Sequence, residues 1–536
     1  MQVIDLALVL LLIVVVAGAL VRFSRIPLPI FLVIVGAGAS FVPGLDHIDV
    51  DPEVFLLLFI PPLLFADARI LPRRDLLRVI KPVLGLALGL VVVTVVCVGY
   101  FIHWLVPAMP LAVAFTLGAI VSPTDAVATV ATTSELPLPA RVTHIVNAES
   151  LLNDATGLVA FKLAVVAAVA SSTVTFGEVG MQFVVLSGGG VLVGIVVEWL
   201  GRKLREKVLA YGSDDPALYS LLTVLVPYAA YLAAESLHVS GILAVVTSGL
   251  WAGGQEVKGL SVEGRRHSRE FWKMISYVFN GLVFVLLGLQ LRHMVAGVES
   301  YGVAYLAFLA FALWAVLMGL RFGWVWASAW ARFKLDWGWS GGHKGPDAKR
   351  LFLLSWAAVR GSITLAAALS VPLLTRDWMP LPERGLVIFL AAATIILTLG
   401  INGISFPYII RRLDAPGDGG EIEEKLARAE MARAALEALS PAMVRLADSQ
   451  DREYAETLMT RYEGRVAMAE GGPRLAEMGA QRVASARSLR LAGIEAERAC
   501  LRDLAEKNLV NDEVFLLLEE ELDQREMTFS REPTRG

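Results

Sequence analysis

Apolar runs of about 20 residues recur along the first 411 positions of the chain, and they constrain the fold more than any other feature. Each run is long enough to cross about 30 Å of hydrocarbon as a helix. The count is about thirteen by this length criterion. The predicted spans are 3–21, 28–43, 53–66, 80–104, 109–132, 144–171, 181–200, 216–237, 240–254, 271–291, 302–330, 350–373 and 385–411.

The composition supports the same fold class. Of the 536 residues, 56% are hydrophobic and only 18% are charged, whereas soluble chains of this length carry more charge. We therefore predict an all-α polytopic membrane protein embedded in a lipid bilayer. Two cysteines, Cys97 and Cys500, give neither a disulfide framework nor a metal-binding spacing. We expect no cofactor and no nucleic-acid partner.

Basic residues in the connecting loops fix the expected orientation. They cluster after the first, third, seventh, ninth, eleventh and thirteenth spans, while the loops between are acidic or neutral. Because cytoplasmic loops carry the excess of Lys and Arg, the N-terminus is expected outside and the C-terminus in the cytoplasm. An odd number of spans follows from this alternation.

Thirteen spans divide as six, one and six, which gives the two halves opposite orientations. This is the organisation of inverted-repeat transporters. The fifth member of each half is interrupted, by "VSPTDAVAT" at 121–129 and by "AAVRGSITL" at 357–365. Paired interruptions of this kind predict discontinuous crossing helices with a binding site near the bilayer midplane.

The character of the chain changes after the last span. Residues 413–420 form a Pro/Gly-rich linker, and residues 421–536 are rich in Ala, Glu, Arg and Leu. This composition predicts a cytosolic α-helical tail. It contains no phosphate-binding glycine loop, so a helical packing or dimerisation unit is favoured over a ligand-binding one.

Polar residues gather inside the sixth span, where a carboxylate costs about 2.5–3.5 kcal/mol. Ser150, Asn153, Asp154 and Gly157 follow the spacing of one helix face, with Glu149 on an adjoining strip. Their oxygens suit a proton or a hard cation. A structural cluster of satisfied polar groups is the alternative, but intramembrane acids are functional by default.

The break in the fifth span supplies further oxygens. Pro123 removes a backbone donor and disrupts the helix there, and Thr124 and Asp125 follow it. Asp125 is either an ion ligand or an N-cap for the following helix segment, and the sequence leaves both interpretations open.

Two arginines inside the spans need anionic partners. Arg321 would be costly if unpaired, and Glu149 is its expected mate. Arg360 lies at the second break, where its charge balances either Asp125 or the ends of broken helices. Both are expected to be structural, because a permanent cation repels a cation substrate. Asp67, at the end of the third span, is a candidate mouth residue.

Four motifs together resemble the monovalent cation/proton antiporter-1 family, which contains bacterial sodium/proton exchangers. They are "SPTDAVAT", "ESLLNDATGLV", "VRGSITLA" and "PPLLFADARI", and the resemblance covers residues 1–411. Many family members have Pro where this chain has Ala126, and the acid of the last motif often falls one position earlier, at Ala66.

The resemblance implies roles for individual residues. The Asn–Asp pair that carries the family's ion site matches Asn153 and Asp154, and its hydroxyl and backbone ligands match Ser150 and Thr124. Na⁺ is then expected at Asp154, Ser150 and Thr124. The family's structural ion pair matches Glu149 and Arg321.

The resemblance also implies an architecture for residues 1–412. Spans within 80–171 and 302–411 form a moving core, and spans within 3–66 and 181–291 form a scaffold that makes a homodimer interface. We expect a secondary active antiporter of a bacterial inner membrane rather than an enzyme. It exchanges Na⁺, with Li⁺ or K⁺ as alternatives, for H⁺. Because Asn153 is uncharged, the exchange is expected to be electroneutral and one for one.

Two other functions fit parts of the pattern. An intramembrane aspartyl protease would use Asp125 and Asp154 as a catalytic dyad, although no protease signature surrounds either residue. A monovalent cation channel with a regulatory tail would conduct ions without coupling them to protons.

Overall fold

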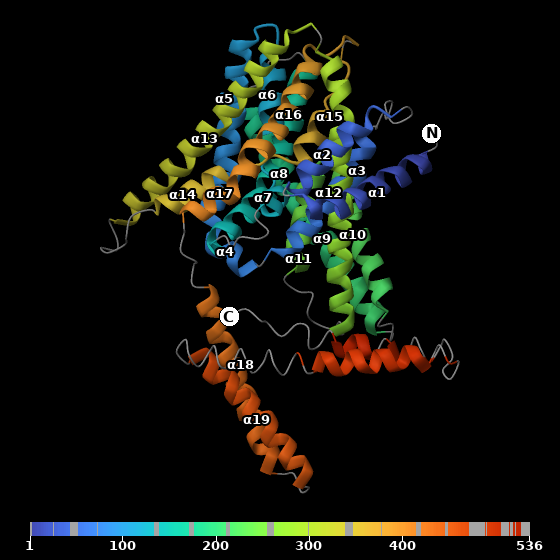
Figure 1. Cartoon of the computed structure of the whole chain (residues 1–536). Helices are drawn as coiled ribbons and strands as arrows, with labels where there is room; N and C mark the ends of the chain where they lie inside the picture. The colour runs from blue at the N-terminus through green and yellow to red at the C-terminus, as the bar shows by residue number, and fades with distance from the viewer. Residues whose placement is uncertain are drawn as a thin grey trace. The chain divides into compact units, whose positions relative to one another are not determined.

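The apolar runs of the sequence form helices, as a computed structural model of the chain shows (Figure 1). The structure describes residues 3–24, 26–42, 52–71, 73–132, 139–170, 176–210, 215–253, 262–298, 300–337, 347–376, 378–413, 420–444, 449–470, 488, 490–504, 507, 514, 518–519 and 521–526. Within these residues nearly all of the chain is helical and no strand forms, apart from one isolated bridge between Leu374 and Pro380. The predicted all-α fold is confirmed.

Nine of the predicted spans each correspond to one helix in the described part of the chain. These helices are α1 (Val3–Leu20, extended by the turn η1, Val21–Phe23), α2 (Leu28–Ala39), α3 (Pro52–Ile70), α8 (Ala140–Ala170), α9 (Phe176–Ala210), α10 (Pro216–Ser236), α11 (Gly241–Gly253), α12 (Val262–Ala296) and α13 (Val303–Trp337).

The remaining four spans are irregular in two ways. Two are interrupted, as α6 (Leu111–Val121) with α7 (Ala126–Thr132), and as α14 (Ala348–Trp356) with α15 (Ser362–Leu369). Two contain a π-helical segment: α4 (Arg73–Leu84), η2 (Gly85–Leu90) and α5 (Val91–Leu105) follow one another, as do α16 (Arg384–Leu397), η3 (Thr398–Gly403) and α17 (Ile404–Leu413). π-Helical segments free backbone groups for other contacts, and the carbonyl of Gly85 accepts a hydrogen bond of 2.9 Å from the Trp324 indole.

Local sequence signals explain where some helices begin. The Asp215 carboxylate accepts a hydrogen bond of 2.8 Å from the backbone N–H of Ala217, and Pro216 occupies the first position of α10. Asp347 caps α14 in the same way, accepting from Lys349 at 3.0 Å. An acidic cap satisfies an N–H group that the first turn of a helix leaves without a partner.

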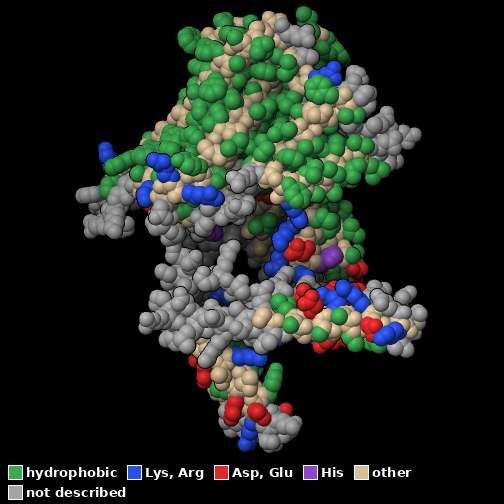
Figure 2. Space-filling model, viewed as in Figure 1, with side chains coloured by type: hydrophobic (Ala, Val, Ile, Leu, Met, Phe, Trp, Pro, Cys, Tyr) green, Lys and Arg blue, Asp and Glu red, His purple; other side chains and the backbone are tan. Residues whose placement is uncertain are grey.

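The outer surface of these helices is apolar. Seven helices in the described part of the chain are long and apolar enough to cross a membrane, and four shorter apolar helices accompany them. Leu12 on α1 and Leu192 on α9 are 61% and 66% exposed. Figure 2 shows apolar side chains over most of this face, with Lys and Arg gathered towards one end. This surface is that of a polytopic membrane protein, as predicted.

Small residues bring the inner helices close together around one continuous apolar core. At Gly118 of α6, an added Cβ would lie 2.8 Å from the backbone oxygen of Val95 in α5. Such an approach allows van der Waals contact between backbones, which is the main source of helix association in a membrane. The tightly packed region includes α6, α8 and α15, the helices that carry the polar residues.

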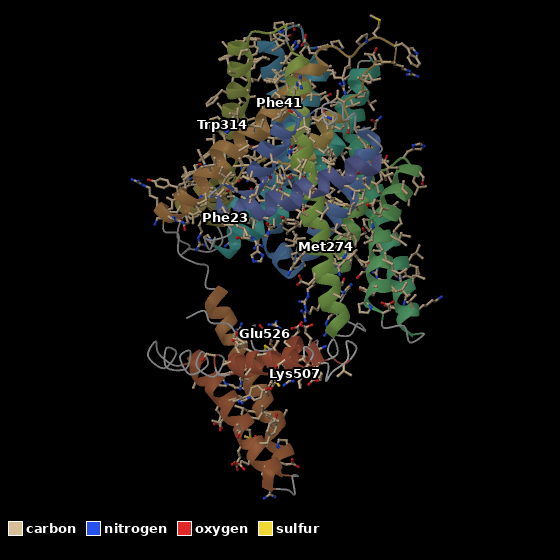
Figure 3. The ribbon with its side chains drawn as sticks, turned by 45° about the vertical axis from the view of Figure 1, so that its right-hand side comes forward. Phe23, Phe41, Met274, Trp314, Lys507 and Glu526 are labelled. Carbon is tan, nitrogen blue, oxygen red and sulfur yellow. The ribbon has the colours of Figure 1, made fainter. Side chains whose placement is uncertain are left out.

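The chain divides into two compact units, residues 1–417 and 418–536. Of the predicted linker 413–420, residues 414–419 lie outside the described part. In the second unit α18 (Gly420–Val444) packs against α19 (Ser449–Glu470). A small separate cluster contains Ile494, Leu501 and Leu522. Figure 3 labels Glu526 in this unit, which forms an ion pair of 2.7 Å with Arg498.

Candidate functional site

The first helix break occupies residues 122–125, between α6 and α7. Pro123 has no backbone N–H and its ring excludes a regular helix, which explains the position of the break. The carbonyl groups at the end of α6 and the N–H groups at the start of α7 lose their helical partners there. Buried groups of this kind need other hydrogen-bond partners inside the protein.

The second break occupies residues 357–361, between α14 and α15, and it touches the first. The backbone N–H of Asp125 donates a hydrogen bond of 2.7 Å to the carbonyl oxygen of Val359. Gly361 begins α15 directly against Asp125: an added Cβ would lie 2.6 Å from the Asp125 Cβ and nearer still to its carboxylate. The two breaks therefore form one crossing, and the contact requires glycine at position 361.

Arg360 satisfies carbonyl groups at this crossing. Its Nε donates to the carbonyl of Val121, the last residue of α6, at 3.1 Å, and its Nη1 donates to Ala358 at 2.8 Å. Its backbone N–H donates to the Thr398 hydroxyl of η3 at 3.1 Å. Of the two partners considered from the sequence, the guanidinium contacts the carbonyl ends of the broken chain rather than Asp125. A cation stabilises the partial negative charge at such an end.

Asp125 has one bonded and one unbonded carboxylate oxygen. Oδ1 accepts a hydrogen bond of 2.9 Å from the N–H of Ala128, so the residue caps α7. Oδ2 is buried and has no hydrogen-bond partner among the described residues. The capping interpretation left open by the sequence therefore describes one oxygen, and the other lies against Gly361 at the start of α15.

Two residues of α8 hold the first break in place. Asn153 donates from Nδ2 to the Thr124 hydroxyl at 2.7 Å and accepts from the Thr124 backbone N–H at 3.4 Å. The Ser150 hydroxyl accepts from the N–H of Ala126 at 3.1 Å. Gly157, on the same helix face, lies against Pro123, where an added Cβ would approach the ring to 2.6 Å. One face of α8 thus packs along the break.

Glu149 and Arg321 form a fully buried ion pair. Both guanidinium nitrogens, Nη1 and Nη2, donate to the Glu149 carboxylate, and the two side chains are at most 2% exposed. Arg321 also donates to the carbonyl of Leu354 at 3.0 and 3.2 Å and to that of Ala357 at 3.3 Å. The pair therefore joins α8 to α13 and satisfies the C-terminal end of α14.

Asp154 is the exception among these buried charges. It is 7% exposed, and its carboxylate has no hydrogen-bond or ion-pair partner among the described residues. It lines a small cavity together with Thr124, Asp125 and Asp67. Asp67, on α3, therefore lies in the same cavity as the residues of the crossing. Asp67, Asp125 and Glu149 all lie near enough to interact with Asp154 electrostatically.

The donor set of the cavity limits what it can hold. Carboxylate and hydroxyl oxygens are hard ligands, suited to a proton or a hard cation. No group of three or more His, Cys, Asp or Glu side chains in the described residues is arranged to bind a metal ion. A lone carboxylate can carry one proton or one monovalent cation, and it is neutral in either state. Left empty, it is an anion in a poorly solvated place, which is energetically costly.

Three further polar residues line the cavity that the sequence analysis did not single out. They are Asn280 on α12 and Ser362 and Thr364 on α15. The signal for Asn280 was present, because an amide interrupts the apolar stretch 278–289. Away from the cavity, Lys162 on α8 forms an ion pair of 2.5 Å with Glu235 on α10.

Comparison with known proteins identifies the family. The family model described as a transmembrane sodium/hydrogen exchanger matches residues 9–412. The uncharacterized Na⁺/H⁺ exchanger YjcE of Escherichia coli is 36% identical, and the match covers 96% of this chain and 97% of that protein. A sodium, potassium, lithium and rubidium/H⁺ antiporter of Bacillus pumilus is 35% identical over 94% of this chain and 74% of its own length.

A solved structure gives the same result for the fold. The sodium proton antiporter MjNhaP1 of Methanocaldococcus jannaschii matches 77% of this chain and 100% of its own, with a TM-score of 0.57 and 18% sequence identity. The family match includes both helix breaks and all of α8. Proteins of this family are transporters rather than enzymes. The chain therefore belongs to the sodium/hydrogen exchangers, a family of multi-pass monovalent cation/proton antiporters.

Proposed function

We propose that residues 1–412 form a secondary active antiporter that exchanges a monovalent cation, Na⁺ in the first place, for H⁺ by alternating access. The unpartnered carboxylate of Asp154 carries this proposal. It lies buried beside a cavity at the crossing of two broken helices. Among the other site charges described above, Asp67 also has no bonded partner in the described residues, but it lies on α3 rather than at the crossing. We therefore take Asp154 as the group whose counter-ion changes.

The cation ligands in this proposal are Asp154, Ser150 and Thr124. The Ser150 hydroxyl accepts one hydrogen bond from Ala126, and the Thr124 hydroxyl accepts one from Asn153. A hydroxyl oxygen has two lone pairs, so each keeps one for a cation. Asp125 is the remaining candidate ligand, through its unbonded oxygen Oδ2, or it acts only as a cap of α7.

One charge is exchanged for one charge in this mechanism. Asn153 beside Asp154 is neutral, and both ends of its amide are used in hydrogen bonds with Thr124. It therefore holds the break and adds no titrating group. With Asp154 as the only carrier, one cation replaces one proton, and the exchange is electroneutral.

In this proposal the membrane unit consists of a core that moves during exchange and a scaffold that does not. The core contains α4 to α8 and α13 to α17, and the scaffold contains α1 to α3 and α9 to α12. A homodimer interface on the scaffold is part of the proposal, as the family resemblance implies. We place the protein in a bacterial inner membrane with the N-terminus outside and the C-terminus in the cytoplasm, because Lys and Arg follow alternate spans.

The choice of cation extends beyond Na⁺ in some relatives. The Bacillus pumilus relative is named as an antiporter of sodium, potassium, lithium and rubidium. Selectivity among such ions depends on the number and field strength of the ligands rather than on their type. We therefore propose Na⁺ as the main substrate, with Li⁺ and K⁺ as the ions to compare.

The test uses the full chain in proteoliposomes with an acidic interior and a pH-sensitive dye. Adding Na⁺, Li⁺ or K⁺ outside should raise the internal pH in turn, and choline should not. An Asp154→Asn protein in matched liposomes is the control for leakage. Cation uptake without any change in internal pH would indicate a channel and would contradict antiport.

The tail, residues 421–536, is proposed to regulate the exchanger. All proposed ion ligands lie before residue 413, whereas the described helices of the tail carry mostly exposed charged residues. Truncation after Asp414 should therefore leave exchange intact and shift its rate or its pH dependence. A truncated protein that inserts correctly but transports nothing would contradict a purely regulatory role.

A further inference from the structure

A polar side chain on α12 faces the same cavity as Asp154. Asn280 lies within an apolar stretch of this helix, where Val283, Val285 and Leu287 are completely or almost completely buried. Met274, labelled in Figure 3, lies on the same helix. α12 packs mainly against α2, with further contacts to α3 and α10, so it belongs to the proposed scaffold.

The Asn280 amide has no hydrogen-bond partner among the described residues, although it is only half-buried and lines the cavity. Buried or membrane-embedded amides are nearly always hydrogen-bonded, because leaving one unsatisfied is costly. The carbonyl and amino groups of Asn280 are therefore available to whatever occupies the cavity. Water and a partly hydrated cation are the two occupants that an amide oxygen beside a carboxylate would favour.

The cavity has two chemically different walls. Asp154, Asp125 and Thr124 come from the proposed core, with the residues 361–364 of α15. The opposite wall comes from the scaffold: Leu63, Leu64 and Asp67 of α3, and Asn280 of α12. If the core moves during exchange, the core ligands travel with the ion and the scaffold residues stay behind.

We infer that Asn280 is a specificity-determining residue, which offers a neutral oxygen to the arriving cation, or to its water shell, from the scaffold side. This inference rests on the proposed exchange at Asp154. Asn280 acts in one access state only, because it does not move with the core. It lowers the cost of partial dehydration before the ion reaches Asp154. A neutral ligand contributes more for a small cation than for a large one, since the attraction grows as the ion radius falls.

The test compares three substitutions by their Li⁺, Na⁺ and K⁺ kinetics in oriented proteoliposomes. Asn280→Leu keeps the branching of the side chain and removes the polar group, and Asn280→Asp keeps the shape and adds a charge. Gln290→Leu removes an amide from the same helix at a position that does not line the cavity, and it is the matched control. Each protein is measured with the cation added on one side and then on the other.

Asn280→Leu should raise KM by about threefold to tenfold on one side of the membrane, the effect of one lost hydrogen bond or neutral ligand. The change should be larger for Li⁺ than for K⁺, and the maximal rate should change less than KM. Asn280→Asp should lower KM on that same side. Its exchange should remain insensitive to membrane voltage, because the added charge is on the wall that does not move. Gln290→Leu should leave both KM values unchanged.

Equal KM changes on both sides, or a fall in maximal rate alone, would overturn the inference and assign Asn280 a structural role. If Asn280→Leu fails to fold, the nearly isosteric Asn280→Asp decides the question by its KM. Unchanged KM values in a protein whose Asp154→Asn variant is inactive would refute only the role of Asn280. Exchange that survives Asp154→Asn would instead refute the proposed function itself.

Discussion

Two carboxylates lie close together on α8 and have opposite surroundings. Glu149 is completely buried, and its two oxygens accept hydrogen bonds from Arg321. Asp154 is nearly as buried but has neither a hydrogen-bond nor an ion-pair partner among the described residues. The energetic cost of burying an acid on this helix is therefore handled differently at the two positions. One acid keeps a permanent counter-ion, and the other has a cavity in which the counter-ion can be replaced.

Glu149 has a fixed counter-ion because Arg321 is itself held by several hydrogen bonds. Arg321 also satisfies carbonyl groups of Leu354 and Ala357, so its position is fixed by three elements and not by Glu149 alone. Breaking such a pair leaves an unpaired charge in a place of low polarity. We therefore propose that the absence of a fixed partner, rather than burial alone, distinguishes the functional carboxylate from the structural one.

The largest effect is expected at the unpaired acid. Asp154→Asn removes the only proposed carrier and should reduce exchange to the level of empty liposomes. The amide has nearly the same shape, so the protein should still insert and elute as a single species from a sizing column. Both are measured on one preparation, by dye dequenching and by chromatography. Exchange above background in this variant would show that Asp154 is not the carrier, and the functional difference between Asp154 and Glu149 would be refuted.

The paired acid should show the reverse pattern. Glu149→Gln and Arg321→Ala should each lower the free energy of unfolding by about 3–5 kcal/mol, because each strands a buried charge. The double variant Glu149→Gln/Arg321→Met should recover part of the loss, since no charge is left over. Thermal unfolding in detergent measures these differences. If the single variants unfold at the wild-type temperature, the ion pair is not what stabilises this region.

An added acid beside Asp154 tests how many charges move with the carrier. Asn153→Asp would put a carboxylate on the moving helix next to the carrier. Wild-type exchange should not respond to a valinomycin-set potassium diffusion potential, whereas exchange by the variant should change with voltage. The initial rates of Na⁺-driven proton movement at several imposed voltages provide the test. A voltage-dependent wild-type protein would mean that another group titrates with Asp154, and Asp125 would be the first to examine.

The smallest effect is expected at Ser150, which lies between the two acids along α8. Ser150→Ala removes the acceptor for the Ala126 N–H and one proposed ligand, each worth about 1 kcal/mol. Cation affinity should fall by a factor of about five. The KM for Na⁺ measures the change, with Ser150→Thr as the matched variant that keeps the hydroxyl. Equal KM values for the Ala and Thr variants would remove Ser150 from the ligand set.

Much of the arrangement of the helix breaks and the buried ion pair could be predicted from the sequence, because single residues there have a large energetic effect. Pro123 predicts the first break, and the cost of an unpaired Arg321 predicts a nearby acid such as Glu149. The choice between the two expected partners of Arg360 and the place of Asn280 could not be predicted in the same way. They depend on distances between segments far apart in the chain, which no local pattern specifies. The pair of Lys162 with Glu235 on another helix was missed for the same reason.

The contact between Asp125 and Val359 bears on whether the cation binds with the same affinity from the two sides of the membrane. That backbone bond, with the bonds of Arg360 to Val121 and of Arg321 to Leu354, ties both breaks into one rigid piece. In the alternating access proposed above, a rigid piece carries an unchanged set of ligands from one side to the other. Its intrinsic binding constant is then the same in both directions. Any difference between inward and outward affinity must therefore originate in the stationary wall that the piece faces.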